Sequence, residues 1–220
     1  MKLFTAPLFL EAFSTAYCPG ETLRVQDFAL KGKAWRLPVR SGGAPVTDWP
    51  FLDYFMPLDS AGVHGLPSVR HLPKASLGRV TTEEWGSRQL GLIYEASPAI
   101  DWKRFEDWPA FVAFVTTRRA RLFDDSQRRY RKLRREAGEP AFVWHDPRQD
   151  VLEQCFAWKS RQFAHAAKVF SNPANRRFME AMRDNGLLTV STFSAGGALM
   201  AVHLGAGFEG RFHSWIMAFN

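Results

Sequence analysis

Two histidines near the end of the 220-residue sequence are the first residues whose chemistry suggests a function. His203 lies in the segment ALMAVHLGAG (198–207), and His213 lies in RFHSWIMAF (211–219). Imidazole gains and loses a proton close to neutral pH, so a histidine that faces a substrate site can act as a general base. The alternative is that both histidines are polar packing residues of a sheet.

The loop between the two segments determines how they pair. A two-residue type I′ loop at Glu209 and Gly210 would hold Glu209 at a positive φ, which is unfavourable for glutamate. A three-residue loop of Phe208, Glu209 and Gly210, with glycine in the left-handed position, avoids this cost. The sequence therefore predicts the three-residue loop.

This loop places His203 opposite Trp215 and Gly205 opposite His213 on one face of the hairpin, with Ala201 and Met217 nearby. The other face is almost wholly apolar, as expected of a core face. We therefore expect the two histidines, the tryptophan and the glycine to form one wall of a cleft. A two-residue loop would instead put the histidines on opposite faces.

Positive charge is concentrated in the segment RRARLFDDSQRRYRKLRR (118–135), which holds nine basic and two acidic residues. The chain has 29 basic and 22 acidic residues, so 29 − 9 = 20 basic and 22 − 2 = 20 acidic residues lie outside this segment. The net charge of +7 therefore comes from one local element.

Three interpretations of the basic segment remain open. Its arginines could form a solvated face beside an apolar stripe of Phe123, Tyr130 and Leu133 that covers the core. They could instead bind a phosphate-bearing ligand or a carrier at a membrane surface. Nucleic acid is the least favoured partner, because only Tyr130 is interleaved with the arginines and no recognised module is present. The residues that we assign to an anionic ligand are Arg128, Arg131 and Arg135.

Composition sets wider limits on the protein. With 46% hydrophobic residues, the chain can bury a sizeable core in one large or two small domains. Cys18 and Cys155 have no CxxC or Cys/His ligand spacing, which predicts a reducing compartment, no disulfide frame and no metal site. Cys155 is expected to be a buried thiol and not a nucleophile. The N-terminus is a poor signal peptide and no apolar run is long enough for a membrane span, so we expect a cytoplasmic protein.

Hydrophobic periodicity predicts a mixed α/β protein with a mainly antiparallel sheet flanked by helices. A helix is expected from Asp107 to Ala137, with a possible break at Asp124-Asp125-Ser126. The other predicted elements are a hairpin over 21–40, a strand over 141–145, helices over 149–168 and 173–185, and a meander of strands over 187–194, 198–207 and 211–219.

The order of these elements and several short motifs resemble a known family. The segments WPAFVAFVTTRRARLFDDSQRRYRKLRREAG, FVWHDP and VLEQCFAWKSRQF, followed by the terminal meander with AVHLG and HSWIMAF, are similar to GNAT-type acyltransferases of the CelD group. These proteins are associated with cellulose and exopolysaccharide biosynthesis and are related to the FemAB peptidoglycan transferases. The resemblance covers roughly residues 90–220. It implies two GNAT-like halves, a degenerate one over 1–106 and a second over 107–220.

The resemblance implies transfer of an acyl group from a thioester such as acyl-CoA to an amine or hydroxyl, in exopolysaccharide or cell-envelope biosynthesis. His203 or His213 would act as the base, and the edge of strand 211–219 would supply the donor for the thioester oxygen. Residues expected to border the acceptor site are Trp158, Lys159, Gln162 and Trp215. For Trp158 and Lys159 the alternative is a core tryptophan beside a solvated lysine.

In the family, the last strand is followed by an Asp and a Tyr-Ser-Pro-Gly-like turn that opens a helix. Such a junction holds the pyrophosphate of the acyl donor on backbone N–H groups. The sequence ends at Asn220, at the position of that Asp, so the donor turn either lies beyond Asn220 or is lacking in this form. The second half is therefore expected to be incomplete.

A different class of function remains open beside acyl transfer. The chain could be a non-catalytic GNAT-like module that binds an anionic partner, either a phosphorylated carrier or RNA, through residues 118–135. For the enzyme, the expected partners are a small-molecule or saccharide acceptor and a phosphorylated carrier at the membrane surface. A tRNA would be a partner only in an aminoacyl-transfer variant.

Overall fold

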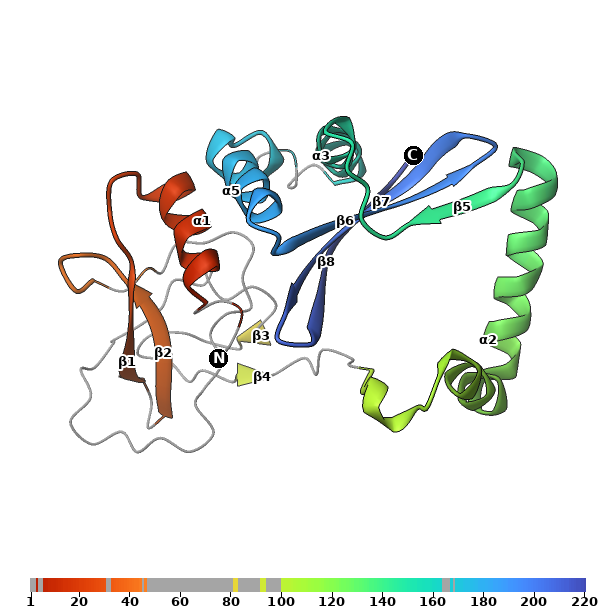
Figure 1. Ribbon diagram of the computed structural model, residues 1–220, viewed down its shortest axis with the longest axis horizontal. Coiled ribbons are helices and arrows are strands. Elements are labelled where there is room, and N and C mark those ends of the chain that lie inside the picture. Colours follow the sequence, from red (N-terminus) through yellow and green to blue (C-terminus); the bar gives the residue numbers. More distant parts are fainter. Residues whose placement is uncertain are drawn as a thin grey trace.

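The computed structural model describes residues 3, 6–30, 33–44, 46, 81–82, 92–93, 100–163, 167 and 169–220. Figure 1 shows an N-terminal helix and hairpin, a long helix at the opposite end, and a twisted four-stranded sheet between them. Helices combine with antiparallel sheets, so the predicted mixed α/β class is confirmed.

The N-terminal part begins with α1 (Pro7–Tyr17), which has a proline in its first turn. The predicted hairpin follows as β1 (Arg24–Leu30) and β2 (Lys33–Val39), paired antiparallel. Asp27 and Arg36 lie opposite each other across this hairpin and form an ion pair with an N–O distance of 2.7 Å. A two-residue strand pair, β3 (Thr81–Thr82) and β4 (Leu92–Ile93), comes later in the chain.

A short 3₁₀ turn, η3 (Trp102–Arg104), leads into α2 (Trp108–Ala137). The carboxylate of Asp107 accepts a hydrogen bond from the Ala110 N–H and caps the start of α2. Gly138, at a φ of 95°, ends the helix as predicted.

The break in α2 does not lie at the predicted Asp124-Asp125-Ser126. The non-helical residue is Arg119 (φ −142°, ψ 44°), two residues after Thr117, whose hydroxyl donates to the Ala113 carbonyl. At the predicted break, Ser126 donates to the Leu122 carbonyl and Asp125 pairs with Arg128, so these polar side chains are satisfied within a continuous helix.

The central sheet consists of β5 (Pro140–Val143), β6 (Leu188–Ala195), β7 (Ala198–Phe208) and β8 (Arg211–Phe219). The strands are antiparallel in the order β5-β6-β7-β8, so the predicted meander is confirmed. Helices α3 (Asp150–Gln162) and α5 (Pro173–Asp184) lie between β5 and β6 in the chain. The first of these ends at Gln162, before the predicted residue 168, because Phe163 is extended.

The core lies between one face of this sheet and the helices α3 and α5, which Figure 1 shows together on one side. Val202, Leu204 and Ala206 of β7 are fully buried in it, as is Ala218 of β8. Helix α1 packs against α5, so the core also includes residues before position 106. The division into halves at 106/107 stays a prediction.

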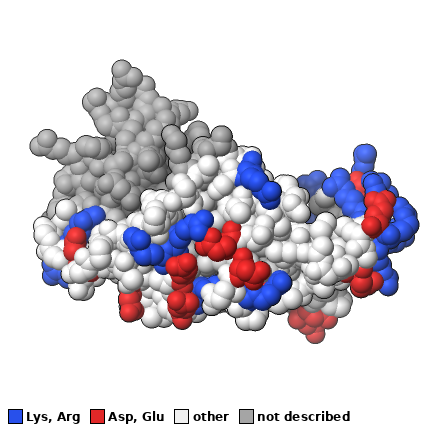
Figure 2. Space-filling model, turned by 90° about the horizontal axis from the view of Figure 1, so that it is seen from above, with Lys and Arg blue, Asp and Glu red and all other residues white. Residues whose placement is uncertain are grey.

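The interpretation that α2 covers the core is wrong for the structure described. None of the α2 side chains is buried, and Leu122 and Tyr130 are 62% and 44% exposed. The main contacts of α2 are with β5 and β6 at its C-terminal end. Figure 2 shows its basic side chains massed at one end of the molecule, whereas basic and acidic side chains intermix over the rest of the visible described surface.

Among the described helices, none has both the length and the apolar composition to cross a membrane. Within the same residues, no group of three or more His, Cys, Asp or Glu side chains could hold a metal ion.

Candidate functional site

The candidate site lies on the sheet face that α3 and α5 leave uncovered. Side chains alternate between the two faces of a strand, and Val202 and Leu204 point into the core beneath these helices. His203 between them therefore points to the opposite face, where it lies across from Ser191 of β6 and Met217 of β8. The imidazole is thus presented on the face of the sheet that points away from α3 and α5.

His203 is paired with a serine hydroxyl from the neighbouring strand. Its Nε2 lies 2.8 Å from Ser214 Oγ, and the role of each atom depends on the imidazole tautomer. Partial burial lowers the pKa of His203 below its ordinary value of 6.5, because desolvation disfavours the charged ring. His203 is therefore neutral near pH 7 and able to accept a proton, either directly or through Ser214.

The hairpin loop differs from the predicted one and changes the pairing. Glu209 (φ 47°) and Gly210 (φ 73°) form a two-residue loop between Phe208 and Arg211. The register then shifts between Leu204 and Gly205, which places a bulge in β8. The predicted register would have placed the Ser214 hydroxyl on the core face, whereas the observed one exposes it beside His203.

The two histidines therefore do not share a surface, and the prediction that both line one wall of a cleft is wrong. His213 lies opposite Ala206, a core position, so it is on the face opposite to His203. Trp215, the bulged residue, packs against the core and does not face His203. Met217 and Ser214 are the residues of β8 beside His203.

Aromatic rings surround His203 on the open face. The Phe212 ring lies 5.7 Å from the His203 ring and 4.9 Å from Trp144, which follows β5. Gly205 makes room for Phe212, since a Cβ at position 205 would lie 2.1 Å from the Phe212 ring. Trp144 is 48% exposed and Phe212 is 41% exposed, so the two rings form an apolar floor that is open to solvent.

The outer edge of β8 is held by two side chains of α3. Lys159 Nζ donates to the Met217 carbonyl at 2.9 Å, and Gln162 Nε2 donates to the Phe219 carbonyl at 2.7 Å. The N–H and C=O of one residue in a strand point to the same side, so the N–H groups of Met217 and Phe219 also face this edge. These N–H groups are candidate donors to a carbonyl oxygen, one strand away from His203.

The remaining α3 residues of interest are structural. Trp158 is buried in the core at 4% exposure, which fits the alternative of a core tryptophan and not a residue at an open site. Cys155 is fully buried, and burial raises the pKa of its thiol to about 12. The prediction of a buried thiol is therefore confirmed.

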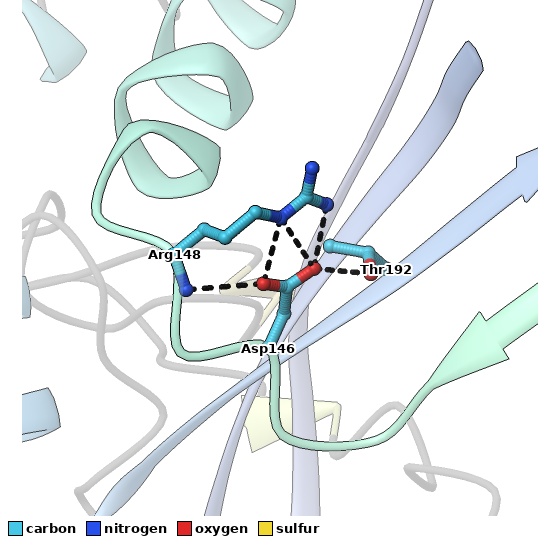
Figure 3. A network of polar contacts seen from close by, with 3 residues as sticks. All are labelled: Asp146, Arg148 and Thr192. Atoms are coloured by element: carbon cyan, nitrogen blue, oxygen red, sulfur yellow. Dashed lines mark hydrogen bonds and ion pairs between the residues drawn. The ribbon is translucent and has the colours of Figure 1, made fainter. Parts of the chain in front are cut away.

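Sequence reasoning missed a buried carboxylate at the loop between β5 and α3. Asp146 accepts hydrogen bonds from Arg148 and from the Thr192 hydroxyl of β6, as Figure 3 shows. The Arg148 contact, with the Thr192 bond, holds the pKa of Asp146 well below its usual range. The signal available in the sequence was a charged residue, Asp146, beside Pro147 in the loop between a predicted strand and a predicted helix. The network fixes the loop that carries Trp144.

The predicted anionic-ligand residues, Arg128, Arg131 and Arg135, lie together on α2 at the far end of the molecule from α1 (Figure 1). The Arg128 and Arg135 side chains are 69% and 73% exposed.

Comparison with known proteins bears on the second half of the chain. Residues 120–220 match the family described as acetyltransferase (GNAT) domain. The matched segment contains most of α2 and all of the four-stranded sheet, α3 and α5. No curated protein and no solved structure matches the chain. The match supports a GNAT-type acetyltransferase and, in general terms, acyl transfer.

Proposed function

We propose that residues 107–220 transfer an acyl group from acyl-CoA to an amine or hydroxyl of an acceptor, in exopolysaccharide or cell-envelope biosynthesis. The observation that carries this proposal is the match of residues 120–220 to the acetyltransferase domain. The CelD-like grouping is part of the proposal and rests on the sequence motifs described above.

In the proposed reaction, His203 takes the proton of the attacking amine or hydroxyl, directly or through the Ser214 hydroxyl. The acceptor atom forms a bond to the acyl carbon, and the bond from that carbon to sulfur breaks. The leaving thiolate takes up the proton held by His203 or one from solvent and is released as the thiol. Charge that builds on the thioester oxygen is stabilised by the outward N–H groups of Met217 and Phe219. His203 of β7 lies directly across from Met217 of β8, so the base and the donors are on neighbouring strands.

The aromatic floor beside His203 favours a saccharide acceptor over a charged one. Trp144 and Phe212 present exposed ring surface, against which the C–H face of a sugar ring can pack. A hydroxyl of a sugar held there would lie close to the imidazole of His203, whose ring is 5.7 Å from that of Phe212. This geometry supports a neutral, ring-shaped acceptor.

The test is release of free thiol from acyl-CoA, measured with a thiol reagent, in the presence of a panel of saccharides and amines. Acceptor-dependent release by the wild-type chain is expected. His203→Gln should lower turnover by about 10²-fold or more, because a positioned base contributes on that order. His213→Gln, on the opposite face, should retain most of the activity, with circular dichroism as the check that both variants fold.

Equal losses in both histidine variants would contradict the assignment of the base. No acceptor-dependent release with any thioester, together with no thermal shift on addition of acyl-CoA, would contradict acyl transfer by this chain. That second result would favour the alternative, a non-catalytic module that binds an anionic partner. The exposed basic helix α2 is the observation in favour of that alternative.

A further inference from the structure

The C-terminal part of α2, residues 120–137, has two different faces. Basic residues recur at helical spacing along one side, and apolar residues recur along the other. The basic side carries Arg121, Arg128, Arg131, Lys132 and Arg135. The apolar side carries Leu122, Phe123, Tyr130, Leu133 and Ala137. This part of the helix is about 27 Å long, at about 1.5 Å per residue.

The apolar side of α2 is only partly covered by the rest of the described protein: Phe123, Leu133 and Ala137 are half-buried, and Leu122 and Tyr130 are exposed. No side chain of the helix is buried, and the side chains of Leu122 and Tyr130 remain 62% and 44% exposed. A soluble helix normally buries such a stripe against a core, because removal of apolar surface from water is favourable in free energy. The exposed part of the stripe is therefore available to a partner with an apolar surface.

A second apolar surface lies around the start of α2, on the other side of the kink at Arg119. The rings of Trp102, Phe105, Trp108 and Phe111 contact one another, with centroids 4.8 to 6.3 Å apart. Trp102 is 52% exposed and Trp108 is 64% exposed. Tryptophan is enriched where an apolar medium meets water.

The basic side is only partly neutralised by the protein itself. Arg128 pairs with Asp125, and Lys132 and Arg135 both pair with Glu136. Within the described residues, neither Arg121 nor Arg131 has a carboxylate within ion-pair distance. The partner of this helix should therefore be anionic as well as apolar.

We propose that α2, with the aromatic cluster at its start, docks the protein on the surface of an anionic lipid membrane. A membrane surface offers both requirements together, with phosphate headgroups for the arginines and acyl chains for the apolar stripe. An RNA would satisfy the arginines but would leave most of the apolar stripe in water. A second copy of the chain would cover the stripe but would bring two sets of arginines close together. This inference does not depend on acyl transfer.

The experiment is cosedimentation of the whole chain with vesicles of phosphatidylglycerol and phosphatidylcholine, and with vesicles of phosphatidylcholine alone. Binding is expected to the anionic vesicles and not to the neutral ones. The triple variant Arg128→Gln, Arg131→Gln, Arg135→Gln should bind about 100-fold more weakly, since each arginine near an anionic surface contributes about fivefold. A matched variant, Arg24→Gln, Arg161→Gln, Arg211→Gln, removes the same charge from exposed positions elsewhere and should bind as the wild type does.

The double variant Leu122→Gln, Tyr130→Gln separates a membrane from a purely electrostatic partner. We expect it to lose about tenfold in vesicle binding while its affinity for RNA stays unchanged. A blue shift of tryptophan fluorescence on vesicle binding, reduced in Trp108→Phe, would support insertion of the aromatic cluster. Since all these positions are exposed, the variants should keep the native circular dichroism spectrum.

Three outcomes would overturn the proposal. One is RNA binding that is tighter than vesicle binding and insensitive to the double variant. Another is a dimer in sedimentation velocity that the double variant dissociates, with no vesicle binding by either form. The third is equal loss of vesicle binding in the α2 triple variant and in its matched control. Acyl-CoA turnover is measured separately, so failure of one proposal leaves the other intact.

Discussion

At the scale of single residues, His203 combines a lowered proton affinity with an accessible position. It is half-buried beside Phe212, and its Nε2 is 2.8 Å from the Ser214 hydroxyl. Desolvation lowers its pKa, so the ring loses its proton below the ordinary value of 6.5. A base with this property is already unprotonated at neutral pH.

The pH dependence of turnover should show this property. In wild-type protein, activity should rise with pH and level off with a midpoint below 6.5, the ordinary pKa of histidine. His203→Gln should remove this rise, and Ser214→Ala should reduce the rate without removing it. The measurement is kcat/KM between about pH 4.5 and 9. A midpoint well above 6.5, or an unchanged profile in His203→Gln, would contradict the assignment.

Asp146 is the residue that we expect to matter most for the stability of the open face. Its buried carboxylate accepts hydrogen bonds from Arg148 and Thr192, and Asp146→Asn should lower the free energy of unfolding by about 2 kcal/mol. Asp184→Asn, at a 73% exposed side chain, should cost less than about 0.5 kcal/mol. Urea denaturation at pH 7 measures both.

The effect of Asp146 should also depend on pH. Because its folded-state pKa lies below the ordinary value of 3.8, the stabilisation is present above pH 3.8 and is lost as the pH falls through the folded-state pKa. The difference in stability between wild type and Asp146→Asn should therefore shrink below pH 3.8. A difference that is constant down to pH 2 would show that the carboxylate charge is not what stabilises the loop.

At the scale of elements, the β7–β8 hairpin decides the form of the candidate site. Its two-residue loop and the bulge at Trp215 bring Ser214 and Phe212 onto the His203 face. The ring of Phe212 occupies the space that Gly205 leaves empty. The hairpin thus depends on Gly205 because the absence of a side chain allows the Phe212 ring to pack closely, and not because the backbone adopts a positive φ there.

Gly205→Ala tests this packing. The new Cβ would lie 2.1 Å from the Phe212 ring and 2.8 Å from the His213 carbonyl oxygen, so ring and backbone must both move. We expect a loss of about 1–3 kcal/mol in the free energy of unfolding and a loss of turnover. Gly207→Ala is the matched control, because nothing lies within 4 Å of its Cβ position. Similar results for the two variants, by thermal denaturation, would contradict the proposed role.

At the scale of the whole molecule, one core joins the N-terminal helix to the second half. Phe178 of α5 is fully buried and contacts Phe9, Phe13 and Tyr17 of α1, with ring centroids 5.6 to 6.3 Å apart. The Tyr17 hydroxyl also donates to Asn175 Oδ1 at 2.6 Å. These contacts couple the two segments on either side of position 106.

Phe178→Ala should therefore destabilise the entire protein. We expect a loss of about 3–5 kcal/mol, from transfer of the ring to water and from the cavity left behind. Phe142→Ala, at a 60% exposed position, should cost less than about 1 kcal/mol. Unfolding followed by far-UV circular dichroism and by tryptophan fluorescence should give one coincident transition. Two separate transitions, only one of them shifted in Phe178→Ala, would show that the halves unfold independently.

Local patterns were sufficient to predict most of the elements. The capped start of α2 at Asp107 and its end at Gly138 follow from side-chain chemistry within a few residues. The order of strands in the meander follows from short turns and alternating apolar residues. The position of the α2 kink was not predictable in this way, because Asp125 and Ser126 found partners inside the helix.

By itself, the sequence determined the fold class, the order of the elements, the buried Cys155 and the concentration of charge in residues 118–135. These features depend on contacts between near neighbours in the chain and on periodicity. Only the tertiary structure decided which residues meet on one surface. A one-residue change in register moves every following side chain to the other face of the sheet. The hairpin has a two-residue loop that holds Glu209 at a positive φ, although glutamate disfavours this conformation, and Phe212 packs over Gly205 in the same hairpin. The resulting register of β7 and β8 places His213 and His203 on opposite faces of the sheet.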